Sequence, residues 1–261
     1  GTASKYWASA YIDAITTTGN ITVGGAITAT TFNGIPFFTD ATNNSMYTHD
    51  VSGTDSTAAQ NTAYGFTAMD AITSGDWNTA IGYGAGGAIN SGASNTLVGH
   101  LTGDALTTGV RNVAIGANAL SAEDAHGYNV AVGYGALSVQ NAGANAYNVA
   151  VGYEAGKAVT TGTRNTIVGG LAGDALTTGN YNVALGFGAL STEDDHGTNV
   201  AIGYSALLVQ NAGAEGYNVA VGYNAGLAVT TGIRNVIMGG SAGDALTTGG
   251  YNIAIGYSAL G

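Results

Sequence analysis

Two short acidic segments bring carboxylates close to a histidine, the residue types most able to do chemistry in this sequence. The segment Glu123-Asp124-Ala125-His126 recurs further along the chain as Glu193-Asp194-Asp195-His196. Carboxylate oxygens and imidazole nitrogens are common ligands of divalent metal ions. Each segment nevertheless precedes a glycine, where a polar turn is expected without any metal. We therefore predict turns, with no metal and no other cofactor. The weak candidate ligands are Asp124, His126, Asp194 and His196.

Three further carboxylates recur in an identical loop, Gly-Asp-Ala-Leu-Thr-Thr-Gly, at Asp104, Asp174 and Asp244. A carboxylate pair that cleaves a glycosidic bond needs two different environments, whereas these three are copies of one another. Hydrogen bonds within turns or caps explain them better. The glycine-rich run at residues 82–87 is not surrounded by a βαβ unit, so it is not a dinucleotide-binding motif. We predict no catalytic residues and no enzymatic activity.

Aromatic side chains recur at two positions of a repeat, just before an asparagine and just after a glycine. Rows of tyrosine could stack on the sugar rings of a cell-surface glycan. The alternative, which we favour, is that the rings stack on one another and fix the register of the repeat. Arg111, Arg164 and Arg234 share the first position, and we expect them to pair with carboxylates of neighbouring coils or chains. The candidate glycan contacts are Tyr128, Tyr147, Tyr181, Tyr217 and Tyr251.

The element that must position all these residues is the phrase Asn-Val-Ala-Ile-Gly, which recurs along the chain in nearly equal steps. Such a fixed period is typical of solenoids. A loop that begins at Gly103 returns unchanged at Gly173 and Gly243, which indicates duplication of a four-coil block. With a weaker copy at Asn61 there are twelve copies of the phrase. The clear ones begin at Asn78, Asn95, Asn112, Asn129, Asn148, Asn165, Asn182, Asn199, Asn218, Asn235 and Asn252.

Each copy predicts one coil of an all-β solenoid, or β-roll. The phrase supplies a strand of about four residues, a segment such as 136–139 makes the return strand, and a Gly-containing turn closes the coil. Coils stacked at the strand spacing of ~4.8 Å would together span roughly 50 Å. The asparagines are expected to form a structural ladder, with amides hydrogen-bonded from coil to coil.

Side-chain alternation gives each strand two faces. In residues 129–133, Val130 and Val132 point one way, and we expect this branched face to fill the lumen. Asn129, Ala131 and Gly133 point the other way, which suits close approach of another backbone. On this reading Val130→Asp or Val132→Asp would bury an unpaired charge and disrupt assembly.

Composition excludes several classes of protein. The chain has 261 residues with 44 Gly, one Pro, no Cys and only 8% charged residues. Without cysteine there is no disulfide and no thiolate metal site. A net charge of −11 argues against nucleic-acid binding, and no apolar run is long enough for membrane insertion. There is no signal-peptide pattern. The chain begins without Met and stops within a repeat, so we expect a piece of a longer or processed polypeptide.

Two regions are expected along the chain. Residues 1–60 form an N-terminal shaft or connector with short strands, including a strand pattern at residues 21–32, a turn at Asn33-Gly34 and an irregular connector at residues 39–60. Residues 61–261 form the repeat domain. A coil this short encloses little volume, so stacking and a partner chain must offset the loss of chain entropy. We expect a homotrimer, with chains intertwined or side by side.

The repeats of residues 61–261 resemble the left-handed β-roll head of the trimeric autotransporter adhesin YadA. They depart from it in their longer coils and in reading Asn-Val-Ala where that family often reads Asn-Ser-Val-Ala. The N-terminal run Ser4-Lys5-Tyr6-Trp7-Ala8-Ser9-Ala10-Tyr11-Ile12-Asp13, followed by residues 19–25, resembles the shaft of bacteriophage tail fibres. Those fibres often carry Asn-Val-Ala-Ile-Gly-Tyr-x-Ala-Leu repeats and end in an intramolecular chaperone of the endosialidase type.

The resemblance implies a structural fibre protein, a trimeric tail-fibre segment located on a virion and involved in host attachment. Its partners would be two further copies of itself and a host cell-surface glycan. The alternative is a bacterial surface adhesin head of the trimeric autotransporter type. An ice-binding solenoid is disfavoured because several coils lack the Thr-Thr pair, and a glycan-degrading spike ranks last because no catalytic set is found.

Overall fold

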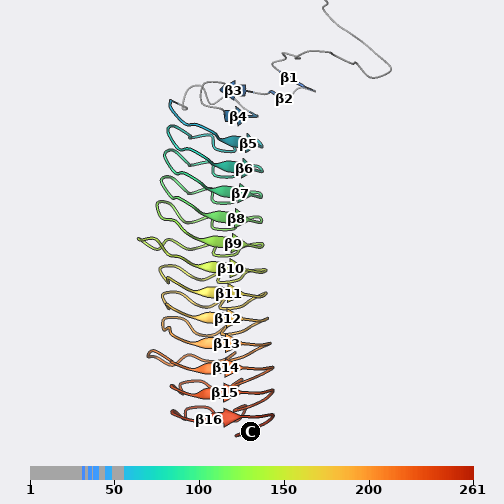
Figure 1. The fold of residues 1–261 in the computed structure, drawn as a ribbon, viewed down its shortest axis with the longest axis vertical. Coiled ribbons are helices and arrows are strands. Elements are labelled where there is room, and N and C mark those ends of the chain that lie inside the picture. The colour runs from blue at the N-terminus through green and yellow to red at the C-terminus, as the bar shows by residue number, and fades with distance from the viewer. Residues whose placement is uncertain (1–30, 33–34, 37, 41–44, 49–55) are drawn as a thin grey trace, which may run out of the picture.

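The computed structural model describes residues 31–32, 35–36, 38–40, 45–48 and 56–261. These residues form an all-β solenoid of about twelve turns, as the repeat predicts (Figure 1). No helix occurs among the described residues. The expected strand at residues 21–32 lies outside them except for its last two residues, as does the N-terminal resemblance to a fibre shaft.

Each coil contributes one three-residue strand to a single sheet, and consecutive strands pair in parallel without a register shift. In β9 and β10, for example, Val130 lies opposite Val149 and Val132 opposite Val151. The twelve repeat strands are β5 (Thr62–Tyr64), β6 (Thr79–Ile81), β7 (Thr96–Val98), β8 (Val113–Ile115), β9 (Val130–Val132), β10 (Val149–Val151), β11 (Thr166–Val168), β12 (Val183–Leu185), β13 (Val200–Ile202), β14 (Val219–Val221), β15 (Val236–Met238) and β16 (Ile253–Ile255).

Part of the segment predicted as an irregular connector belongs to the sheet instead. β4 (Ser45–Tyr47) pairs in parallel with β5, and β3 (Phe38–Asp40) pairs with β4 in the antiparallel direction. Short strands β1 (Thr31–Phe32) and β2 (Ile35–Pro36) form a separate antiparallel pair on either side of the expected turn. β3 and β4 therefore extend the sheet beyond the first repeat.

The predicted return strand is wrong, because residues 136–139 are turns. The backbone alternates into the left-handed region there, with φ of 63° at Gly135 and 50° at Leu137. Such residues bend the chain and cannot continue an extended strand. Each coil therefore has one strand, and the rest of its circumference is a succession of tight turns.

The assignment of the two strand faces is also wrong. Asn129 and Ala131 are buried in the lumen, while Val130 and Val132 point outward and are partly exposed. Alternation shows that two faces exist but not which one is inside. The lumen is narrow, and buried Leu137 enters it from the turn of the same coil. A small residue on the strand leaves room for that side chain.

Coils with a large inward residue on the strand show the same compensation in reverse. Leu97 replaces the strand alanine, and the turn position that holds Leu120 and Leu137 in the next two coils is Gly103. A Cβ at Gly103 would lie only 2.9 Å from a methyl group of Leu97. Ile167 with Gly173 and Ile237 with Gly243 repeat this exchange. Leucine thus stands at this turn position only in coils whose strand residue is alanine, which avoids a clash between the two side chains in the lumen.

Asparagines line up along the axis at the inner edge of the sheet. The Oδ1 of Asn148 accepts the backbone N–H of Asn165 at 2.8 Å, and the Nδ2 of Asn165 donates to the carbonyl of Gly179 at 2.8 Å. Each such amide therefore hydrogen-bonds to backbone groups of two coils. Most hydrogen bonds of the ladder run to the main chain, and only a few run between amides. Buried polar groups are costly unless paired in this way.

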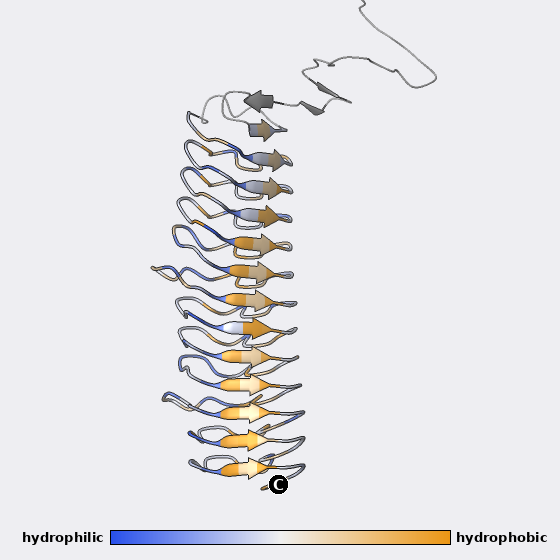
Figure 2. Ribbon diagram, viewed as in Figure 1, coloured by the Kyte–Doolittle hydropathy of each residue, from blue (hydrophilic) through white to orange (hydrophobic). Residues whose placement is uncertain are grey.

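A glycine follows every repeat strand and allows the coils to approach closely. Gly133 has φ of +134°, and a Cβ there would collide with the carbonyl oxygen of Gly152 in the next coil. Only glycine tolerates this backbone conformation without strain. Figure 2 shows the strands that precede these glycines. The first residue is more hydrophilic in β5 to β7 and in β11, where threonine replaces the usual valine.

No helix among the described residues has the length and apolar character needed to cross a membrane.

Candidate functional site

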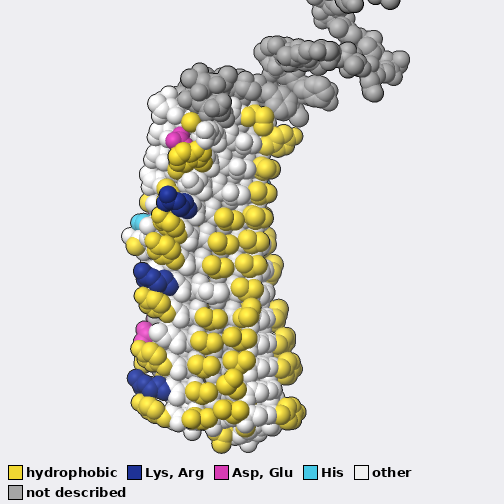
Figure 3. All heavy atoms as spheres, in the orientation of Figure 1, with side chains coloured by type: hydrophobic (Ala, Val, Ile, Leu, Met, Phe, Trp, Pro, Cys, Tyr) yellow, Lys and Arg dark blue, Asp and Glu magenta, His cyan; other side chains and the backbone are white. Residues whose placement is uncertain are grey.

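The outward face of the parallel sheet is a long apolar surface. The first and third residues of every repeat strand point outward in two parallel columns, and most are valine, isoleucine or leucine. Ile81, Ile115 and Leu185 are exposed to a similar degree, at 41%, 39% and 42%. Figure 3 shows this face as adjacent columns of hydrophobic side chains that run along the solenoid. We call it the apolar sheet face.

A row of aromatic rings borders this face at the position after the strand glycine. Ring centroids of successive members are 5.4–6.1 Å apart and nearly parallel. The stacking is interrupted where the position holds Ala117, Gly170 or Gly240. We call this the tyrosine row, and it comprises Phe66, Tyr83, His100, Tyr134, Tyr153, Phe187, Tyr204, Tyr223 and Tyr257.

A second row lies at the position before each asparagine and combines arginine with tyrosine. The guanidinium of Arg164 lies 5.9 Å from the ring centre of Tyr147 and 5.5 Å from that of Tyr181, and its Nη1 donates to the Tyr181 hydroxyl at 3.2 Å. Arg234 is held in the same way between Tyr217 and Tyr251. Figure 3 shows positively charged side chains in one column beside the apolar sheet face. We call this the arginine–tyrosine row.

The expected pairing of these arginines with carboxylates of neighbouring coils is not what the described residues show. Arg111 donates to the Tyr128 hydroxyl at 2.6 Å, and Arg164 and Arg234 lie between tyrosine rings. Guanidinium groups are weakly hydrated and stack well on aromatic faces. Within the described part of the chain, the aromatic neighbours therefore take the place of the expected carboxylates.

All five candidate glycan contacts belong to the arginine–tyrosine row and reach the surface. Tyr147 has one ring face against Tyr128, at 4.9 Å, and the other towards Arg164. The edge of the Tyr147 ring, more than either face, is therefore open to a ligand. Sugar binding by Tyr128, Tyr147, Tyr181, Tyr217 and Tyr251 stays a prediction.

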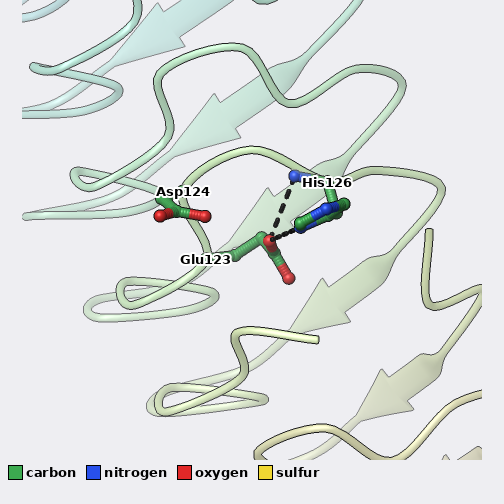
Figure 4. A group of neighbouring side chains, drawn as sticks. All are labelled: Glu123, Asp124 and His126. Carbon is green, nitrogen blue, oxygen red and sulfur yellow. Dashed lines mark hydrogen bonds and ion pairs between the residues drawn. The ribbon is translucent and has the colours of Figure 1, made fainter. Parts of the chain in front are cut away.

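The first acidic segment is built around a carboxylate that points into the lumen. Figure 4 shows Glu123 between Asp124 and His126. Its Oε1 lies 3.3 Å from His126 Nδ1 and accepts the His126 backbone N–H at 3.1 Å. Its Oε2 accepts a hydrogen bond from Gln140 at 3.1 Å. Asp124 is exposed, and possible ligand atoms of the three residues lie within 4.8 Å of one another.

The sequence predicted a polar turn here, but it did not reveal that Glu123 is fully buried. Gln140 in turn accepts a hydrogen bond from the Asn148 amide at 2.8 Å, so a polar chain runs from Glu123 to the asparagine ladder. A metal ion would have to replace hydrogen bonds that already satisfy the carboxylate. Metal binding at Asp124 and His126 stays a weak prediction, and the geometry favours a hydrogen-bonded turn.

The second acidic segment repeats the arrangement with fewer hydrogen bonds. Glu193 is buried, its Oε1 lies 3.6 Å from His196 Nδ1, and its Oε2 has no hydrogen-bond partner. Burial raises the pKa of the Glu193 carboxyl to about 7, partly offset by the backbone N–H of His196. Asp194 and His196 are the corresponding weak metal candidates. Glu193 thus carries a proton more readily than an exposed glutamate.

The loop carboxylates Asp104 and Asp174 are partly buried, and burial raises the pKa of both. Each has one buried oxygen without a hydrogen-bond partner. They lie in separate loops four coils apart, so they do not form a pair that could act on one substrate.

Comparison with known proteins adds nothing to this geometry. No protein-family model matches the sequence, and searches of curated proteins and of solved structures found no match either.

Proposed function

We propose that this chain is a structural fibre protein, a homotrimeric segment of a bacteriophage tail fibre that takes part in host attachment and has no catalytic role. The observation that carries the proposal is the apolar sheet face. Contiguous exposed apolar surface of this extent marks an interaction site. Its column of third strand residues follows the whole repeat region, as expected for a partner of equal length, while threonine interrupts the other column in four coils.

A second copy of the chain is the partner that fits best. Its repeat has the same rise per coil, so outward residues of one copy would match grooves of another along the whole length. In a fibre all chains run in the same direction, which favours cyclic symmetry over a face-to-face antiparallel pair. Three copies in a ring also agree with the resemblance of the repeats to trimeric adhesin heads and phage fibres.

The test is the mass of the purified protein in solution, measured by light scattering during size-exclusion chromatography. We expect three chains of 25.7 kDa each. Val132→Asp combined with Val151→Asp would place charges on the apolar sheet face, and we expect monomers that keep their β-sheet circular dichroism. Asn141→Asp, which adds charge on an exposed turn, serves as the matched control and should remain trimeric. A monomeric wild-type protein would overturn the proposal.

The tyrosine row and the arginine–tyrosine row are exposed, and they favour one alternative, a bacterial surface adhesin head of the trimeric autotransporter type. Both readings need the same assembly but different locations. Antibodies raised against the repeat region would label phage particles under the first proposal and intact bacterial cells under the second.

A further inference from the structure

An open pocket lies on the outer surface of three successive coils in the first half of the repeat region. Its volume is about 390 Å³, within the usual range for small-molecule sites. Side chains from the coils that begin at Asn112, Asn129 and Asn148 line it. The polar and aromatic members are Asn118, Ser121, Tyr134, Ser138, Glu154 and Lys157.

The pocket exists because its central coil has small residues. Gly135 occupies the position that is Asn118 in the preceding coil and Glu154 in the next one. A Cβ at Gly135 would meet only Glu154 Cγ, at 3.6 Å, so the space beside it is open. Ser138 likewise leaves room between Ser121 and Lys157.

One wall of the pocket is an aromatic ring with a single stacked neighbour. Tyr134 stacks on Tyr153 with ring centroids 5.6 Å apart. On its other side the tyrosine row holds Ala117, so no ring stacks there. The next ring in that direction is His100, two coils away, which corresponds to roughly 10 Å along the axis. The row therefore has a gap of one ring beside the pocket.

The remaining walls carry hydroxyl, amide, carboxylate and ammonium groups, which can donate or accept hydrogen bonds. Lys157 Nζ lies 3.0 Å from Glu154 Oε2, and Ser121 Oγ donates to the backbone carbonyl of Ser138 at 3.1 Å. Asn118 adds an amide, and exposed Val139 adds a small apolar patch. The opposite charges of Lys157 and Glu154 cancel, so the pocket does not select for an ionic ligand.

We propose that this pocket binds one neutral pyranose unit of a glycan. A pyranose has an apolar C–H face that suits the Tyr134 ring and a rim of hydroxyl groups that suit the serine, amide, carboxylate and ammonium groups. The proposal goes beyond the fibre role and does not depend on it, because one chain supplies every lining residue.

The second block of the solenoid provides an internal comparison, because leucine replaces two of the polar lining residues there. At the equivalent positions of that block, Ser205 replaces Gly135, Leu208 replaces Ser138 and Leu227 replaces Lys157. A methyl group of Leu208 lies 3.4 Å from where a Cβ at Gly188 would stand. The aromatic gap is also filled, since Phe187 stands at the position of Ala117 and stacks on Tyr204 at 5.6 Å.

The test is saturation-transfer difference NMR on the full chain with the methyl glycosides of glucose, galactose, N-acetylglucosamine and N-acetylgalactosamine. Mannitol, which has hydroxyl groups but no ring, is the ligand control. We expect transfer to the ring C–H protons of at least one glycoside and none to mannitol. Tyr134→Ala should reduce the signal about tenfold, whereas Tyr204→Ala, its counterpart in the second block, should leave it unchanged.

A second variant guards against misfolding. The combination G135S, S138L and K157L copies side chains of the second block, and with N118G, which copies Gly188 beside Leu208, the fold should persist. We expect circular dichroism like that of the wild type and loss of glycoside binding. Undiminished transfer in this variant, equal losses in the two tyrosine variants, or no transfer from any glycoside would each overturn the proposal. Mass measured on the same samples reports separately on the trimer.

Discussion

Residues 95–164 and 165–234 are two copies of one four-coil block, and they agree inside the coil much more closely than outside it. Inward residues Ala131, Leu137 and Gln140 recur as Ala201, Leu207 and Gln210. Outward positions differ: Ser138 and Lys157, which line the pocket of the first block, are Leu208 and Leu227 in the second. The lumen allows little change because neighbouring coils share it, while each outward side chain can change alone.

Comparison of the two blocks therefore distinguishes the residues that maintain the solenoid from the residues that form the proposed binding site. A substitution of an apolar lumen residue should have the same effect in both blocks, and a substitution at the surface should have an effect that depends on the block. The four predictions below use this contrast, and each could contradict it.

The largest effect is expected at the glycine that ends each strand. Gly133→Ala and Gly203→Ala would each place a Cβ against a carbonyl oxygen of the next coil, at φ of +134° and +135°. We expect losses of at least ~3 kcal/mol in the free energy of urea unfolding for both. Gly143→Ala is the control, because a Cβ there meets nothing within 4 Å and should cost only about 1 kcal/mol.

Leucine truncation in the lumen comes next. Leu137→Ala and Leu207→Ala each create a cavity at a fully buried position, and we expect ~2–5 kcal/mol from each in urea unfolding. The sites are four coils apart, so the losses should add in the double variant. Clearly unequal losses would show that the two lumens are not equivalent.

The buried glutamate of the second block should make stability depend on pH. Because the pKa of Glu193 is raised to about 7, the folded chain holds a proton that the unfolded chain loses near its ordinary pKa of 4.5. The contribution of Glu193 to the free energy of unfolding is therefore greatest below pH 4.5. It falls by ~1–3 kcal/mol as the pH rises to about 7.

Glu193→Gln should flatten this decline in thermal melts recorded from about pH 5 to about pH 8. Asp195→Asn, which removes an exposed carboxylate of the same turn, is the control and should leave the decline in place. A wild-type melting temperature that rises over this range would contradict the assignment.

The smallest effect is expected in the tyrosine row. Phe187→Ala would give the second block the gap that Ala117 makes in the first, and removes one ring stacked on Tyr204. We expect the free energy of urea unfolding to fall by ~0.5–1.5 kcal/mol more than the loss of buried area alone would cause. A larger loss would mean that the row contributes to the scaffold as well as to the surface.

The period of the sequence was sufficient to predict the solenoid, the strand positions and the column of asparagines. It was not sufficient to orient the strand, because Ala131 and Val130 are both apolar. The missing signal is that a large strand residue always occurs with glycine in the turn, as in Leu97 with Gly103, while leucine in the turn occurs only with a strand alanine, as in Ala131 with Leu137. Only residues that share the lumen compensate each other in this way.

The buried glutamates could have been found by the same alignment of coils. The position that Glu123 occupies in its coil is held by Ile72, Ile89 and Leu106 in the three preceding coils, which marks it as inward. The pocket could not have been predicted, because it depends on which side chains of three coils meet across turns with left-handed residues. Periodicity carries no information about such contacts.

Because every coil pairs with the next in the same way, the length of the molecule depends only on its number of coils. Every copied four-coil block meets its neighbours through the same main-chain bonds, so an additional block would lengthen the rod by roughly 19 Å without disturbing the rest. Reach is thus adjustable in fixed increments by gene duplication alone, while the outer side chains of each new segment remain free to diverge.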